Sequence, residues 1–248
     1  KIVKKQGQSV RIIENKHEAL ESAQVLYNKL TGPLGWELLL IKRDSDVIVA
    51  QTTAVQNIDE YSKRDFGRPK RDAFVGMLPP KLAQTMINLA KPHDDTVVVD
   101  PFCGTGVVLQ EALLMGHDVI GSDLSDRMVE YSQTNTEWIL TQNIGKNTGK
   151  VLDIYQADAI KHNWDFAKYE ALNPQTTISV VCETYRGKPL TTVPEKQALA
   201  EIMNEANTIA KGFLKNLTPQ LAKGARTCVA LPAWNIGSNR FLHLKVLD

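Results

Sequence analysis

Apolar residues follow two alternating patterns from residue 76 onward. Short runs of consecutive apolar residues predict buried strands, at residues 97–99, 118–122, 150–157, 177–182 and 227–231. Apolar residues at helical spacing predict helices between and around them, over residues 81–90, 107–114, 127–140 and 195–217. In the third of these helices the residues expected to face inward are Met128, Tyr131, Thr134 and Ile139. Because strands alternate with helices through short connections, the pattern predicts an α/β domain with a mostly parallel sheet.

The first 58 residues have a different pattern, which predicts a small α+β piece. We expect a strand over residues 9–13, a helix over 17–30, and two strands over 36–42 and 46–55 joined by a tight turn. One helix against three strands makes a thin core. Residues 1–58 are therefore expected to be the back half of a larger module, or a unit that leans on the domain after it.

Residues 59–75 are predicted to be a basic linker. Gly67 and Pro69 break regular structure within it. Positive residues outnumber acids in this segment: Lys63, Arg64, Arg68, Lys70 and Arg71. Arg64, Arg68, Lys70 and Arg71 are candidates for contact with nucleic-acid phosphates, although a solvated basic linker accounts for them equally well.

The amino-acid composition gives information about the cellular setting of the protein but not about its chemistry. The 248 residues are enough for a real core, and 29 basic against 28 acidic residues leave little net charge. The three cysteines have no paired spacing, so we expect neither a disulfide framework nor a zinc site, and a reducing, cytoplasmic setting follows. No membrane-spanning run or signal peptide is visible, and because the chain opens on Lys1 we expect an upstream portion to be missing.

The strand at residues 97–99 is followed by Asp100 and by a glycine turn at residues 104–106. In doubly wound sheets, ligands bind outside the carboxyl ends of the strands, where such turns allow a close approach. Asp123 ends the next strand, where an acid can accept both ribose hydroxyls of an adenosine cofactor. A dinucleotide site would need a glycine where Leu109 stands, and Asp100 would repel a pyrophosphate. Asp100 suits the cationic amino-acid end of S-adenosylmethionine (SAM), so we favour SAM over a dinucleotide or an unliganded turn.

The third strand ends near Asp158, which is predicted either to bond an adenine amino group or to cap a helix. The fourth strand runs into Cys182, Glu183, Thr184 and Tyr185. An exocyclic amine on a base is a poor nucleophile until acceptors bond its hydrogens, and an aromatic ring must hold the extracted base. Glu183 and the backbone carbonyls beside it are the predicted acceptors, and Tyr185 is the predicted stacking ring.

This loop departs from the usual pattern of amino-methyltransferases, which have an acid or Asn, two prolines and an aromatic. Cys182 stands where the acid or Asn is expected and Thr184 where a proline would stiffen the loop. Both departures put catalytic competence in question. Cys182 is also a candidate nucleophile for C5-methylation of a pyrimidine, although a cysteine closing an apolar strand is more often core, and Cys103 is expected to be a packing residue.

Four motifs together resemble a known family. They are Arg-Asp-Phe-Gly-Arg-Pro at residues 64–69, Gly-Met-Leu-Pro-Pro-Lys-Leu-Ala-Gln at 76–84, Asp-Pro-Phe-Cys-Gly-Thr-Gly at 100–106, and the loop with Glu183 and Tyr185. The chain resembles, over residues 36–235, the tRNA guanosine-N2 methyltransferases that pair a THUMP RNA-binding module with a Rossmann-like, SAM-dependent methyltransferase domain. Some relatives have Thr-Glu-Pro-Tyr in this loop, which keeps Glu183 and Tyr185 in register.

The resemblance implies a cytoplasmic enzyme that methylates the N2 amine of a guanosine near the D stem of tRNA, at a site of the position-10 type. Residues 1–58 would be a partial THUMP-like RNA-binding region, and residues 76–248 the methyltransferase domain, with its C-terminal hairpin expected to be missing. The resemblance implies SAM as the cofactor and tRNA as the partner. It implies no membrane or metal, and it specifies no accessory subunit. A DNA adenine or cytosine amino-methyltransferase, or an inactive SAM-binding RNA-binding module, remain alternatives.

The candidate residues follow from these motifs. The catalytic candidates are Glu183, Tyr185 and Cys182. The resemblance also implies that Leu78 and Pro79 wall the methionine end of SAM. The cofactor-binding candidates are Leu78, Pro79, Asp100, Pro101, Phe102, Gly104, Thr105, Gly106, Asp123, Leu124, Asp158 and Ala159.

Overall fold

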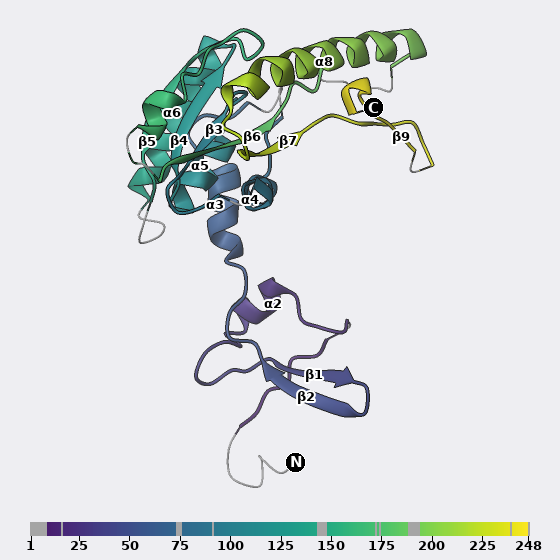
Figure 1. Ribbon diagram of the computed structural model, residues 1–248. Helices are drawn as coiled ribbons and strands as arrows, with labels where there is room; N and C mark the ends of the chain where they lie inside the picture. Colours follow the sequence, from purple (N-terminus) through teal and green to yellow (C-terminus); the bar gives the residue numbers. More distant parts are fainter. Residues whose placement is uncertain are drawn as a thin grey trace. The chain divides into compact units, whose positions relative to one another are not determined.

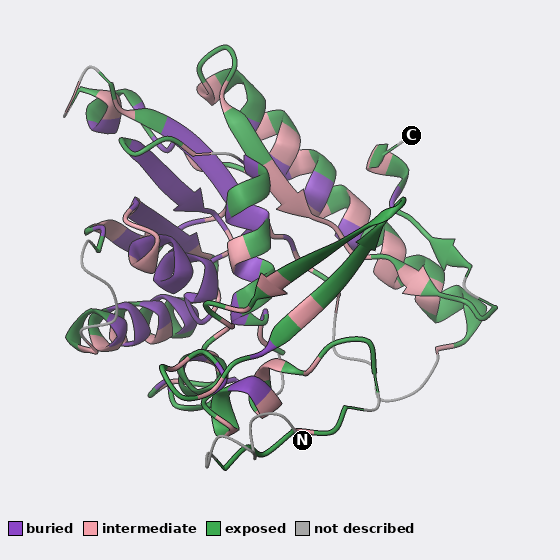
Figure 2. Ribbon diagram, turned by 90° about the horizontal axis from the view of Figure 1, so that it is seen from below, coloured by how far each residue is buried: buried purple, intermediate pink, exposed green. Residues whose placement is uncertain are grey.

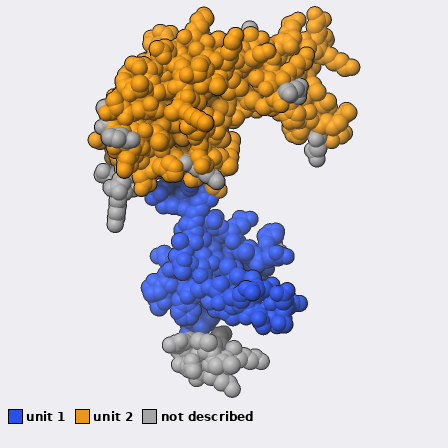
Figure 3. All heavy atoms as spheres, in the orientation of Figure 1, with its two compact units in different colours: residues 1–62 blue, residues 63–248 orange. Residues whose placement is uncertain are grey.

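The structure is a computed structural model. It describes residues 9–15, 17–72, 76–90, 92–142, 148–171, 173, 175–187, 194–238 and 240–247. The chain forms two compact units, Lys1–Ser62 and Lys63–Asp248 (Figure 3). No helix in the described ranges has both the length and the apolar character needed to cross a membrane.

The first unit contains a short helix, α2 (Ser22–Tyr27), and the strands β1 (Leu38–Arg43) and β2 (Asp46–Gln51), which pair antiparallel (Figure 1). Arg43 lies opposite Asp46, so Asp44 and Ser45 form the two-residue turn, with Asp44 in the left-handed region at φ 51°. The predicted hairpin is confirmed, although its second strand ends earlier than expected. Most of its apolar side chains are exposed on both faces.

The predicted helix over residues 17–30 is much shorter in the structure. Glu21 and Gln24 form a reciprocal capping box at its start. At its end Lys29 takes a left-handed conformation, and the Leu30 N–H bonds the carbonyl of Val25 at 3.0 Å, which closes the helix. The strand predicted over residues 9–13 is wrong: that segment is irregular, because β1 and β2 pair only with each other among the described residues.

The second unit is built on a five-stranded parallel sheet. Its strands are β3 (Thr96–Asp100), β4 (Asp118–Asp123), β5 (Val151–Gln156), β6 (Thr177–Glu183) and β7 (Arg226–Ala230). Their order is β5-β4-β3-β6-β7, which confirms the predicted parallel α/β sheet. The strand order reverses between β3 and β6, and in open α/β sheets the crevice outside that point is where ligands bind.

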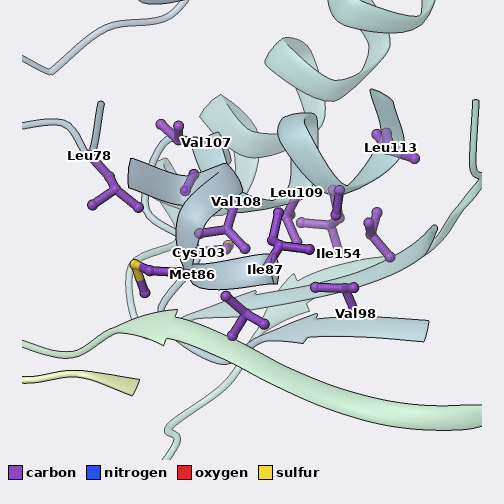
Figure 4. Close-up of a cluster of buried hydrophobic side chains, with 14 of the residues drawn as sticks. Leu78, Met86, Ile87, Val98, Cys103, Val107, Val108, Leu109, Leu113 and Ile154 are labelled. Atoms are coloured by element: carbon purple, nitrogen blue, oxygen red, sulfur yellow. The ribbon is translucent and has the colours of Figure 1, made fainter. Parts of the chain in front are cut away.

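Helices cover both faces of this sheet. They are α4 (Pro80–Ala90), α5 (Val107–Leu114) and α6 (Asp126–Thr141) on one face, and α7 (Ala167–Glu170) and α8 (Lys196–Leu217) on the other. Alternate residues of β3 serve the two cores: Val98 packs with α4 and α5 (Figure 4), whereas Val97 and Val99 pack beneath Phe213 of α8. Buried colour fills the central strands in Figure 2, as expected for a sheet covered on both sides.

The face of α6 that packs inward differs in part from the prediction. Met128 and Ile139 are buried as expected, whereas Tyr131 and Thr134 are only half-buried. The other inward positions are held by Val129 and by small polar residues: Ser132, Asn135 and Thr136. These polar side chains all form hydrogen bonds with nearby backbone, which is why the helix tolerates them there.

The predicted linker is helical in its first part, and this helix ends at Phe66, immediately before the break predicted at Gly67. The helix α3 (Ile58–Phe66) has Asp59 and Glu60 in its first turn and Lys63 and Arg64 in its last. This arrangement complements the helix dipole, so part of the basic cluster is a helix C-terminus.

The last turn of α3 is fixed to α5 by a buried ion pair. Arg64 Nε lies 2.8 Å from Glu111 Oε1, with side chains 5% and 1% exposed. Gln84 donates a further hydrogen bond of 2.7 Å to Glu111 Oε2. This packing agrees with the division of the chain, which places residues 63–72 in the second unit.

The chain after β7 adds a small antiparallel pair. A 3-10 turn, η1 (Thr218–Gln220), follows α8, and β8 (Trp234–Asn235) pairs with β9 (Phe241–Leu242) apart from the main sheet. A final 3-10 turn, η2 (Lys245–Leu247), follows, and the adjacent Leu244 packs on Ala206 and Ala210 of α8. This short pair does not join the five-stranded sheet.

Candidate functional site

A cavity of about 600 Å³ lies at the carboxyl ends of the central strands. The ends of β3, β4 and β6 and the residues just after β5 form its walls, together with residues 76–78 and the side of α8. Of the predicted site residues, those that line it are Leu78, Asp100, Pro101, Phe102, Gly104, Thr105, Asp123, Leu124, Asp158, Ala159, Glu183 and Tyr185. Pro79, Gly106 and Cys182 are not part of the wall.

The glycine turn after β3 depends on backbone conformations that favour glycine. Gly104 has φ 53° and Gly106 has φ 82°. A Cβ at Gly106 would lie 3.1 Å from the Cα of Ser132 on α6, so a side chain there would press on backbone. Ser132 Oγ donates to the carbonyl of Gly104 at 2.9 Å. Gly106 therefore supports the turn from behind rather than facing the cavity.

Asp123 joins the end of β4 to this turn. Its Oδ2 accepts the N–H of Gly104 and its Oδ1 accepts the N–H of Ser125, both at 2.9 Å. Burial raises the pKa of Asp123, and these backbone hydrogen bonds oppose the rise. One carboxylate thus fixes the turn and also lines the cavity.

Asp100 is the most deeply buried acid of the site. The N–H of Phe102 donates to its Oδ1 at 3.0 Å. Burial raises the pKa of Asp100 well above its ordinary value, the Phe102 hydrogen bond opposes this, and the charges of Asp123 and Glu183 add to it. A cation bound beside these carboxylates would relieve their mutual repulsion.

Asp158 follows β5, caps the turn after it and also lies in the cavity wall, whereas its bond to an adenine amino group stays a prediction. Its Oδ1 accepts the N–H of Ile160 at 3.0 Å, which caps the turn that follows, and its Oδ2 lies 3.2 Å from Lys161 Nζ. The Ile160 hydrogen bond is the main cause of the lowered pKa of Asp158. The same carboxyl lines the cavity, so the cap is present and does not remove Asp158 from the site.

The loop after β6 brings Glu183 and Tyr185 to the cavity. Burial raises the pKa of Glu183, and Arg186, whose Nε lies 3.5 Å from Glu183 Oε2, lowers it. Tyr185 and Glu205 of α8 both line the cavity, and burial and this acid raise the pKa of Tyr185. Both predicted groups therefore meet in one cavity with Asp100 and Asp123.

Thr184 fixes this loop in the place where a proline was expected. It is buried, and its N–H and its Oγ1 both donate to the carbonyl of Ala230 at the end of β7, at 3.0 and 3.2 Å. A proline has no N–H and no hydroxyl, so it would form neither bond. The departure from the motif replaces a rigid ring by two hydrogen bonds.

Neither cysteine near the site is placed as a nucleophile. Cys182 is fully buried in the core under Phe213, and burial raises its thiol pKa well above the ordinary value. The prediction of a catalytic side chain at Cys182 is therefore wrong, because a nucleophile needs an accessible thiolate. Cys103 packs in the other core cluster, with its Sγ 3.3 Å from Ser132 Oγ, which confirms its expected packing role.

The predicted phosphate contacts divide into buried and accessible residues. Arg64 is buried against Glu111, and Arg68 is buried with Nη2 3.2 Å from Asp65, so neither guanidinium is placed to reach a phosphate. Burial lowers the pKa of Arg68. Lys70, paired with a surface acid, and Arg71, which lies over a phenyl ring, remain accessible.

Asn135 is a functional position that the sequence analysis missed. Its Oδ1 accepts the N–H of Lys70 at 3.0 Å, and its Nδ2 donates to the carbonyls of Lys70 and Thr105 at 2.9 and 2.8 Å. It thereby joins the segment after α3 to the glycine turn. The sequence signal that could have identified Asn135 is its place two helical turns after Met128, on the buried side of the helix.

No three His, Cys, Asp or Glu side chains gather as a metal site in the described parts of the chain. The profile of a family described as RMKL-like, methyltransferase domain, matches residues 68–233. These residues include both the glycine turn and the loop after β6. The chain belongs to this methyltransferase family. The family match begins at Arg68, so it does not extend to the first unit.

Curated relatives of this methyltransferase include two archaeal proteins named tRNA (guanine(10)-N2)-dimethyltransferase. The one from Methanocaldococcus jannaschii is 38% identical over 96 residues, which are 37% of this chain and 27% of that protein. The one from Methanothermobacter thermautotrophicus is 31% identical over 175 residues, 69% of this chain and 44% of that protein. The match thus spans less than half the length of either relative.

Among solved structures, this methyltransferase is similar to TrmN from Thermus thermophilus. The TM-score is 0.43 at 18% identity, over 78% of this chain and 48% of that one. A possible methylase from Clostridium difficile 630 gives a TM-score of 0.44 at 13% identity, over 79% of this chain and 55% of that one.

Proposed function

We propose that this methyltransferase transfers a methyl group from SAM to the N2 amine of a guanosine in tRNA, at a site of the position-10 type. The observation that carries the proposal is the cavity in which the strand-end acids Asp100 and Asp123 meet Glu183 and Tyr185. The names of the archaeal relatives and the motifs in residues 64–69 and 76–84 support the tRNA substrate.

SAM fits the chemistry of this cavity. SAM supplies a methyl group activated on a positively charged sulfonium, beside an ammonium group. The buried, mutually repelling carboxyls of Asp100 and Asp123 suit a cationic ligand, and Asp100 would take the ammonium end, directly or through water. Asp123 would accept the ribose hydroxyls, and Asp158 the adenine amine. Apolar residues such as Leu78 and Phe102 complete the walls.

Glu183 and Tyr185 would prepare the guanine amine. The lone pair of this amine is spread into the ring, and a carboxylate that accepts an N–H hydrogen bond localises it on nitrogen. Glu183 is the acid at the end of β6 that can do this, and Tyr185 in the cavity wall offers a ring on which the base stacks.

The organisation of the whole protein is part of the proposal. Residues 1–58 would belong to a THUMP-like RNA-binding region, and residues 59–75 would connect it to the methyltransferase domain over residues 76–248. Lys70 and Arg71 would contact tRNA phosphates, and the protein would act in the cytoplasm. The resemblance of the linker motif supports these assignments.

Replacing Asp123 by alanine is expected to weaken SAM binding by about 1–3 kcal/mol, the range for losing charged hydrogen bonds. The loss has two sources, the ribose contact and the support of Gly104. Calorimetric titration with SAM measures it. Asp126→Ala removes an exposed acid at the start of α6 and should leave the affinity unchanged. Equal affinities in the two variants would remove Asp123 from the cofactor site.

Replacing Cys182 by alanine is expected to preserve methyl transfer, because its thiol lies in the core. The unfolding free energy should fall by about 0.5–3 kcal/mol, as for ordinary core changes. Single-turnover rates and denaturant unfolding measure the two effects. An inactive but folded Cys182→Ala protein would instead favour C5-methylation of a pyrimidine.

Nucleoside analysis tests the function itself. The full-length protein is incubated with labelled SAM and, in separate reactions, with unmodified tRNA or with unmethylated DNA, and N2-methylguanosine in tRNA is the expected product. Label on cytosine C5 or adenine N6 would refute the assignment, and label on DNA alone would favour the DNA amino-methyltransferase. SAM binding without turnover on tRNA from a methylation-deficient source would indicate an inactive RNA-binding module.

A further inference from the structure

The charges around the cavity are strongly unbalanced. The described residues that line it include five acids: Asp100, Asp123, Asp158, Glu183 and Glu205. Within the same described lining, Arg186 is the single positively charged side chain. Asp158 is paired with Lys161 from outside this lining, so among the other four acids the position of Arg186 determines which carboxyl has a positive partner in the cavity wall.

Arg186 is directed at one acid and rests on one glycine. Its Nε lies 3.5 Å from Glu183 Oε2, and the two side chains are 44% and 26% exposed. A Cβ on Gly76 would lie 2.9 Å from Arg186 Nη2, so the guanidinium occupies the space that a side chain would fill. Gly76 also has φ 78°, which disfavours any other residue. Arg186 thus spans from the end of β6 to the segment before α4.

We propose that Arg186 is a positioning residue for methyl transfer, which holds the Glu183 carboxylate in the cavity as the acceptor for the guanine amine. This inference rests on the proposed function. Arg186 follows Tyr185 in the same loop, and the pattern expected for this loop specifies no cation at its position.

The surroundings of Glu183 make such a partner necessary. Asp100 at the end of β3 is close enough to interact with it electrostatically, the buried thiol of Cys182 precedes it on β6, and Glu205 of α8 lines the same cavity. None of these groups stabilises a negative charge at Glu183. Burial raises the pKa of Glu183 and Arg186 lowers it, so loss of Arg186 would leave the acid protonated over a wider pH range.

Arginine suits this place better than lysine. The guanidinium is planar and carries several N–H donors, so one edge can face Glu183 while another rests over the flat backbone at Gly76. A lysine ammonium would preserve the charge without spanning both groups. The two substitutions therefore separate charge from position.

Three variants of the full chain test the proposal: Arg186→Gln, Arg186→Lys and, as a matched control, Arg127→Gln. Arg127 is another arginine paired with an acid, at 2.7 Å from Asp72, but it lies on α6 outside the cavity lining. For Arg186→Gln we expect a fall in kcat of about 10- to 100-fold near neutral pH, and an acid limb of the pH–rate profile displaced to higher pH. Arg186→Lys should recover part of the lost kcat and part of the displacement of the acid limb. Arg127→Gln should have the kcat and the pH–rate profile of the wild type.

A double-mutant cycle decides between acting through Glu183 and acting on RNA. In a Glu183→Gln background, Arg186→Gln should cause no further loss in single-turnover rate, because the residue on which it acts has gone. SAM affinity by calorimetry should stay unchanged throughout. Additive losses, together with weaker and less salt-dependent tRNA binding, would overturn the proposal in favour of a phosphate contact.

A spectroscopic readout keeps the inference separate from the proposed function. If the wild-type protein methylates no tRNA, the function fails. The Glu183 carboxyl can still be titrated by NMR in side-chain-labelled protein. Its pKa should be higher in Arg186→Gln than in wild type or Arg127→Gln. Equal values would overturn the pairing, whatever the substrate.

Discussion

Replacing Glu183 by glutamine is expected to slow methyl transfer to tRNA by about 10²- to 10⁴-fold, the range for losing a positioned proton acceptor. Glutamine preserves the size of the side chain and one acceptor oxygen, but not the negative charge that localises the amine lone pair. SAM affinity should be retained, because Glu183 faces the substrate end of the cavity in our proposal. Single-turnover rates with saturating SAM measure the chemical step.

Glu201→Gln is the matched control for this experiment. Glu201 is exposed on α8 and does not line the cavity, so the variant should transfer methyl groups at the wild-type rate. If Glu183→Gln were also fully active, another acceptor would have to prepare the amine. An equal loss of rate and of SAM affinity would mean that Glu183 holds the cofactor.

Replacing Glu111 by alanine is expected to lower the unfolding free energy by about 3–5 kcal/mol, which is a large share of the stability of a typical domain. The change removes the carboxylate that pairs with the buried Arg64 guanidinium and that accepts a hydrogen bond from Gln84. Burial already raises the pKa of Glu111 while Arg64 lowers it, so each charge of this pair depends on the other. Urea unfolding at neutral pH measures the loss.

Two comparisons make this prediction specific. Replacing both partners, as Arg64→Met with Glu111→Leu, should be nearly neutral, because it removes the buried charges together. Breaking the exposed pair of Lys70 and Glu130 by Lys70→Ala should cost about 1 kcal/mol or less. A loss below about 1 kcal/mol in Glu111→Ala would show that water reaches Arg64 in solution.

The α/β unit follows closely from the pattern of the sequence. Runs such as the three valines of β3 are buried on both sides, and a short apolar run of this kind indicates an inner strand of a sheet. The acids Asp100 and Asp123 could be placed at one edge because parallel strands end together. The strand order could not be read from periodicity, because it depends on which crossover the packed helices favour.

The first unit and the basic segment were harder to predict for physical reasons. Helical spacing over residues 17–30 does not reveal that Lys29 turns left-handed and ends the helix. Composition cannot distinguish a solvated arginine from a buried one, and the partner of Arg64 lies 47 residues away on another helix. For the same reason Arg186 and Glu205 could be assigned to the site only from the structure, which places the loop after β6 and the helix α8 around one cavity.

The attachment of residues 64–70 to the α/β unit has a practical consequence for protein production. A catalytic fragment cut at residue 76 would lack both Arg64 and Lys70. It would leave the Glu111 carboxylate buried without its counter-ion, and deprive the amide of Asn135 of two of its three partners. An expression clone of the domain must therefore begin upstream of Arg64, or it will be purified with a loosened cofactor loop.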